Sequence, residues 1–110
     1  MNISTKDKKF FLEMIGYLQD ANTFSTKYQI KPYVRILKNT TSNEYELFIQ
    51  IFSKLKHVLS TREEKVLSSL YGVGINKCSL KMIAKDLQIS SERVRQIRNE
   101  AEFKLANELI

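Results

Sequence analysis

The chain has 110 residues, of which 43% are hydrophobic and 27% charged. This composition predicts a packed globular protein, and the length permits one compact domain or two small helical subdomains but excludes a large enzyme. The formal net charge of +6 suits a polyanion such as nucleic acid. The excess lies mainly towards the N-terminus, however: residues 1–58 hold nine basic and five acidic side chains, and residues 59–110 hold nine and seven.

Several features exclude other classes of protein. Three Gly and one Pro are few for a sheet-rich fold, so we predict an all-α protein. A single cysteine, Cys78, permits no intramolecular disulfide and no cysteine-based metal cluster, and a single histidine, His57, adds little. The sequence has no glycine-rich phosphate loop, no apolar signal core and no apolar run of membrane-spanning length. We therefore expect a cytoplasmic protein that is not an enzyme, with no cofactor, metal or membrane partner.

The N-terminal third contains one clear helix and one ambiguous segment. Residues 6–19 carry apolar side chains at helical spacing and are preceded by a capping residue, Ser4 or Thr5. Residues 20–28 are polar and predict a loop. Residues 29–38 contain Pro32, which is compatible with the first turn of a short helix and also with a short strand. A polar break follows at residues 39–43, where Thr41 and Glu44 have the spacing of a capping box.

Residues 44–58 form the most apolar predicted helix. Its main stripe is wide enough to need burial on more than one side. A central core helix is the favoured interpretation, and the alternative is a homodimer or partner surface on the 44–59 helix. The stripe consists of Tyr45, Phe48, Phe52, Leu55 and Leu59.

The C-terminal half predicts three helices, the last two joined by a tight turn. The first begins with a capping box, Ser60 with Glu63 or Thr61 with Glu64, and ends at Gly72 and Gly74. The second spans residues 79–87, Gln88 and Ile89 turn the chain, and a Ser90-capped helix continues to about residue 108. Two short helices around a tight turn, with polar residues opening the second, are typical of a helix-turn-helix. The buried row of the last helix is Val94, Ile97, Ala101 and Leu105.

Polar side chains at the start of the last helix suit DNA recognition. Arg donates two hydrogen bonds to guanine, Gln pairs with adenine, and Glu accepts from the cytosine amino group. The N-terminal end of such a helix enters the major groove, which places Ser91, Glu92, Arg95 and Gln96 nearest the bases. The alternative is a solvated helix face with ion pairs such as Glu92–Arg95 and Arg98–Glu102. The candidate DNA-binding residues in this helix are Ser91, Glu92, Arg93, Arg95, Gln96, Arg98 and Asn99.

These segments together resemble region 4 of sigma-70 family factors. The resemblance covers roughly residues 58–107 and rests on Arg62-Glu63-Glu64-Lys65-Val66-Leu67, on Ser79-Leu80-Lys81-Met82-Ile83-Ala84, and on Glu92-Arg93-Val94-Arg95-Gln96-Ile97. It implies a small helical bundle that binds double-stranded promoter DNA at the −35 element and docks on the flap of the RNA polymerase beta subunit. By position, Glu92, Arg95 and Gln96 would read bases, and Arg62 and Arg93 would lie near the backbone.

The chain departs from the family pattern in three places. Ser91 stands where Arg is common and Arg98 where an acidic residue is common, so we expect an altered −35 sequence. Residues 1–57 do not resemble the region that binds polymerase core and reads the −10 element. We thus divide the chain into a helical N-terminal subdomain, 1–57, and a region 4-like domain, 58–110, and expect a second protein to supply the −10 function. The alternative is a protein that does not bind DNA and uses a sigma-like fold to occupy RNA polymerase or a sigma factor.

Overall fold

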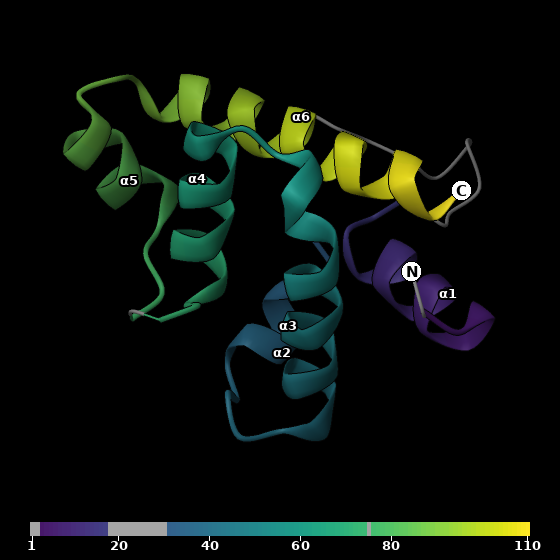
Figure 1. Ribbon diagram of the computed structural model, residues 1–110. Helices are drawn as coiled ribbons and strands as arrows, with labels where there is room; N and C mark the ends of the chain where they lie inside the picture. The colour runs from purple at the N-terminus through teal and green to yellow at the C-terminus, as the bar shows by residue number, and fades with distance from the viewer. Residues whose placement is uncertain (1–2, 18–30, 75) are drawn as a thin grey trace. The chain divides into compact units, whose positions relative to one another are not determined.

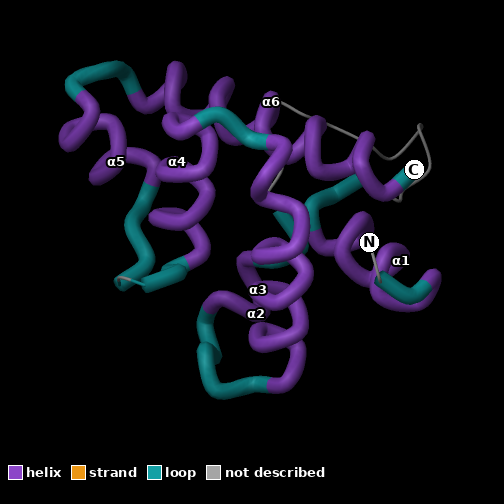
Figure 2. Tube along the Cα trace, in the orientation of Figure 1, coloured by secondary structure: helices purple, strands orange, loops and turns teal. Residues whose placement is uncertain are grey.

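The computed structural model describes residues 3–17, 31–74 and 76–110, and these residues form helices and connecting turns without a strand (Figures 1 and 2). The all-α prediction is confirmed. The chain forms two compact units, residues 1–54 with Leu109, and residues 55–108 with Ile110. The division into domains 1–57 and 58–110 stays a prediction. The helices are α1 (Thr5–Met14), α2 (Val34–Leu37), α3 (Asn43–Leu55), the 3₁₀ helix η1 (Lys56–Val58), α4 (Thr61–Tyr71), α5 (Leu80–Leu87) and α6 (Ser91–Leu109).

The first unit begins with α1, which Ser4 caps by accepting a hydrogen bond from the Asp7 amide at 3.1 Å. The helix predicted for residues 6–19 is too long. It ends at Met14, and Gly16 follows with a φ of +86°, a left-handed conformation that glycine adopts without strain and that closes helices. Residues 18 and 19 and the predicted loop at 20–28 lie outside the described residues.

Residues 31–42 settle the ambiguous segment. Val34–Leu37 form α2, so the strand alternative is wrong. The predicted Thr41–Glu44 capping box is also wrong. Ser42 accepts from the Tyr45 amide at the start of α3, whereas Thr41 hydrogen-bonds the Asn39 side chain. Glu44 instead pairs with Arg35 of α2 at 3.2 Å, so its carboxylate is engaged by another helix.

The core of the first unit is aromatic. The Phe48 ring of α3 stacks on Phe11 of α1 with centroids 4.9 Å apart, and it lies 5.6 Å from the Tyr33 ring. Phe48 and Phe52 are fully buried, so the prediction of a core helix is confirmed for this part of the apolar stripe. The helix predicted to reach residue 58 ends as an α-helix at Leu55 and continues as η1.

In the second unit, η1 leads into α4, where Ser60 and Glu63 make the capping box. Of the two spacings that the sequence allowed, this one is confirmed. Gly72 ends the helix with a φ of +76°. Helices α5 and α6 follow, and their caps are Ser79 and Ser90, as predicted. Helix α6 ends at Leu109, one residue beyond its predicted end near residue 108. Each serine hydroxyl accepts an amide hydrogen bond from the first turn of its helix.

Candidate nucleic-acid interface

Helices α5 and α6 and the turn between them form the predicted helix-turn-helix. Gln88 closes α5 in the left-handed region, with a φ of 58°, and the Ile89 amide donates to the Ala84 carbonyl at 3.0 Å. The left-handed conformation of Gln88 and the Ile89–Ala84 hydrogen bond together end α5 and turn the chain within two residues. Ser90 then starts α6 by accepting from the Arg93 amide at 3.0 Å.

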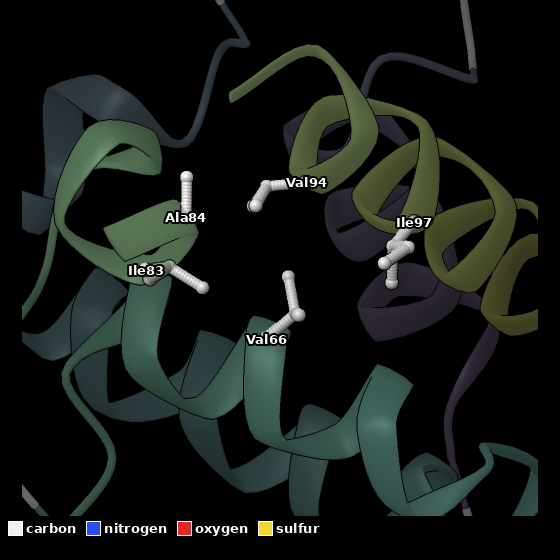
Figure 3. Close-up of a cluster of buried hydrophobic side chains, with 5 residues drawn as sticks. All are labelled: Val66, Ile83, Ala84, Val94 and Ile97. Atoms are coloured by element: carbon white, nitrogen blue, oxygen red, sulfur yellow. The ribbon is translucent and has the colours of Figure 1, made fainter. Parts of the chain in front are cut away.

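A cluster of aliphatic side chains holds this turn against α4 (Figure 3). Val66 comes from α4, Ile83 and Ala84 from α5, and Val94 and Ile97 from α6, and the five side chains point toward one another. Their contacts bury one side of α6 and leave its other side at the surface. The four residues of the predicted buried row of α6 are all buried. Partly buried side chains complete the cluster, namely Leu70, Cys78, Leu80, Leu87 and Ile89.

The exposed side of α6 carries the residues predicted to contact DNA. Four of them, Ser91, Glu92, Arg93 and Gln96, are exposed. The other three are half-buried, namely Arg95, Arg98 and Asn99. Arg62 lies apart from this group, exposed on α4 as the second residue of that helix.

Most of these side chains hydrogen-bond one another. Arg95 donates a hydrogen bond to each carboxylate oxygen of Glu92, from Nε to Oε2 at 2.8 Å and from Nη2 to Oε1 at 2.6 Å. Arg93 donates to the Gln96 carbonyl oxygen at 3.3 Å. The Arg98 guanidinium donates twice to Asn99, at 3.2 and 3.0 Å. The exposed side of α6 thus carries a set of intrahelical pairs, the strongest of them between Glu92 and Arg95.

The electrostatics of the interface follow from these pairs. The hydrogen bonds that Arg95 donates to Glu92 raise the pKa of Arg95, and the negative charge of Glu92 raises it further. Burial acts in the opposite direction but is the weaker effect, so the Arg95 side chain stays cationic. Arg93 also lies 3.9 Å from Glu100, a longer and weaker contact. Both cations are therefore partly compensated before any DNA is present.

One buried and one partly buried polar contact stabilise α6 from behind, and neither was predicted from the sequence. The Tyr71 hydroxyl donates to the buried Glu102 carboxylate at 2.6 Å, and Lys104 donates to Glu63 at 2.9 Å. The suggested Arg98–Glu102 pair is wrong, because Arg98 turns to Asn99 and Glu102 faces Tyr71. The partners are 31 and 41 residues apart, so helical spacing gave no signal of them.

Two exposed lysines on α5 were also not selected from the sequence. Lys81 and Lys85 lie one turn apart on the first helix of the motif, and both are exposed. That helix crosses the DNA backbone in helix-turn-helix complexes, so the motif itself supplies the signal that would have found them. Lys65 of α4, by contrast, pairs with Asp86 at 3.4 Å.

Two further kinds of site are not found among the described residues. None of their His, Cys, Asp and Glu side chains form a group of three or more that could hold a metal ion. No helix in the described ranges has both the length and the apolar character needed to cross a bilayer.

Comparison with known proteins gives one match. Residues 57–106 match the family model described as Sigma-70, region 4. Neither the curated proteins nor the solved structures contain a match to the chain. The matched residues span α4, the α5–α6 helix-turn-helix and most of α6.

Proposed function

We propose, from the premise that residues 57–106 are a sigma-70 region 4 domain, that this chain reads a −35-like promoter element and docks on RNA polymerase. The family is a DNA-binding helix-turn-helix family of transcription regulation and not a family of enzymes. The proposal that the chain reads a −35-like element depends on the Ser90-capped start of α6. Glu92, Arg95 and Gln96 lie there, on the side of the helix that faces away from the aliphatic cluster.

The proposed base contacts come from the first two turns of α6. Glu92, Gln96 and Asn99 follow one another at spacings of four and three residues, so they share one face of the helix. Arg95 flanks that face, and Ser91 precedes it. Their amide, carboxylate and guanidinium groups offer both donors and acceptors to the base edges of the major groove.

The proposed backbone contacts surround this face. Lys81 and Lys85 on α5, and Arg93 on α6, are exposed cations. Arg62 on α4 and the half-buried Arg98 complete the set in this proposal. Such contacts give affinity and fix the register on the duplex, but they carry no sequence information.

The protein partners are part of the same proposal. Region 4 supports an interaction with RNA polymerase in general, and we assign the contact to the flap of the beta subunit. A second protein would supply the −10 function. A homodimer would use the outer face of α3, where a groove of about 660 Å³ includes Tyr45 and Ile49 among its lining residues. Each of these partners would add contacts that a single helix-turn-helix needs for tight binding.

The alternative is an interaction protein that occupies polymerase or a sigma factor without binding DNA. The pairing of Arg93 with Gln96 favours it, because the Arg93 guanidinium occupies the Gln96 oxygen that would accept a hydrogen bond from a base. Pull-down of core polymerase by a chain that shows no affinity for duplex DNA would support this alternative.

The test is selection from a randomised duplex pool, followed by gel shifts across salt concentrations. We expect a preferred sequence and a binding constant that falls as salt rises. Arg95→Ala should relax the preference at one base pair, whereas Lys81→Ala should weaken binding to all sequences and reduce the salt slope by about one. Lys9→Ala, an exposed cation of α1, is the charge-matched control and should change neither. Binding without sequence preference or salt dependence would reject the proposal.

A further inference from the structure

The Glu92–Arg95 pair engages one particular edge of the arginine. Nε and Nη2 make the two hydrogen bonds, at 2.8 and 2.6 Å, so the carboxylate lies against the side edge of the guanidinium. The Arg95 side chain is 24% exposed, against 61% for Glu92. Most of the Arg95 side chain is therefore covered by protein atoms, and the carboxylate orients its guanidinium.

A guanidinium has a second edge of different geometry. Nη1 and the outer hydrogen of Nη2 form an end-on fork, which is distinct from the side edge that Glu92 contacts. A fork of two parallel N–H groups matches the O6 and N7 acceptors of guanine. An arginine held by its side edge can therefore present its end fork to a base without losing its partner.

We propose that Glu92 is a positioning residue that orients Arg95 for a guanine, rather than a reader of its own base. This inference rests on the proposed function, and it names Arg95 as the residue that recognises a G·C pair. Holding the head before DNA arrives reduces the side-chain entropy lost on binding, since Arg is among the most flexible side chains.

The other arginines of α6 are held differently. Arg98 donates its two bonds to a single neutral oxygen of Asn99, and Arg93 makes one hydrogen bond of 3.3 Å and a 3.9 Å contact with Glu100. Among the described arginines of α6, Arg95 alone has a two-point contact with a carboxylate. This contrast is the reason for assigning the guanine to Arg95.

The carboxylate has a second effect that the test must separate. Its negative charge repels DNA phosphates, so removing it should raise affinity for every sequence. A positioning role, by contrast, affects discrimination at one base pair only. Glu100→Gln removes the same charge from the same helix without touching Arg95, and it is the matched control.

The experiment is a double-mutant cycle on the selected duplex and its single base-pair variants. We expect Arg95→Ala to reduce discrimination at one G·C pair about tenfold. Glu92→Ala should reduce discrimination several-fold at that same pair, and Glu92→Gln less, since its amide keeps one acceptor oxygen. Adding Glu92→Ala to Arg95→Ala should cause no further loss there.

Two results would overturn the inference alone. Glu92→Ala could shift the preference at a different base pair, additively with Arg95→Ala, in which case Glu92 reads a base itself. It could instead leave every preference unchanged, as Glu100→Gln should, in which case the pair is only a solvated contact. A wild-type chain without any sequence preference would reject the proposed function and this inference with it. Thermal melting of each variant checks that these substitutions leave the fold intact.

Discussion

The two units of this protein bury different kinds of side chain. In the first unit, three aromatic rings from separate segments meet, and each one buries a large area. In the second unit, five aliphatic side chains form the cluster between α4 and the helix-turn-helix, and the buried Tyr71 ring is held separately by its hydroxyl bond to Glu102. The buried charged groups differ as well. Lys31 donates to the Ile15 carbonyl at the end of α1 in one unit, and Glu102 accepts from Tyr71 in the other.

This difference suggests how stability is distributed. The first unit depends on a few large side chains, so a single truncation should remove much of its stability. The second unit divides its stability among many small contacts and two polar ones, and small side chains such as Ala84 let helices approach closely. Four changes test this comparison, ordered from the largest expected effect to the smallest.

Phe48→Ala should have the largest effect. Removing a fully buried ring that touches two others should lower the free energy of unfolding by about 3–5 kcal/mol. Denaturant unfolding measures the loss, and hydrogen exchange should locate it in α1 and α3 while amides of α4 to α6 keep their protection. Phe103→Ala, at a ring that is 53% exposed, is the control and should cost far less. Equal losses of protection in both units would contradict the division into separate domains.

Tyr71→Phe should come next. It removes the donor to a buried carboxylate, which should lower the free energy of unfolding by about 1–3 kcal/mol. The double variant Tyr71→Phe with Glu102→Leu removes both polar groups and should recover most of this loss, since no buried polar group is then left without its partner. Denaturant melts of the wild type and these two variants provide the measurement. A double variant less stable than Tyr71→Phe would show that Glu102 has a different stabilising role.

Ser90→Ala should lower the free energy of unfolding by about 1 kcal/mol, because it removes the acceptor for the Arg93 amide at the start of α6. The same substitution at Ser91, which follows the cap, serves as the matched control for stability and should change it little. Thermal melts give the stability. Gel shifts with Ser90→Ala should also show weaker sequence preference, since fraying would disturb the turn that carries Glu92. Unchanged stability would mean that packing alone defines where α6 begins.

The smallest effect concerns pH and Glu63. Burial raises the pKa of this carboxyl, but hydrogen bonds from Lys104 and Ser60 outweigh burial and lower the pKa below its ordinary value of 4.5. The folded state therefore binds this proton less readily than the unfolded state does. The stabilisation is present above pH 4.5 and is lost as the pH falls through the lowered pKa of the folded state. The free energies of unfolding of the wild type and Glu63→Gln should differ at neutral pH and converge in acid. A difference that stays constant with pH would contradict the proposed contribution of the Glu63 carboxylate.

The sequence by itself determined the local features of the second unit. Ser79 and Ser90 were identifiable as caps, and Ser60 as one of two candidates, because a capping bond spans three residues. The buried row of α6 followed from helical spacing. The same features carried the resemblance to region 4, and the family match covers nearly the same residues.

Only the tertiary structure decided which side chains meet across the chain. Glu102 is the partner of Tyr71, Lys104 is the partner of Glu63, and Arg35 of α2 lies beside Glu44 of α3. Such pairs join residues whose separation in sequence carries no periodic signal, so they depend on how the helices pack. The edge of Arg95 that Glu92 contacts belongs here too, because spacing predicts a pair but not its geometry.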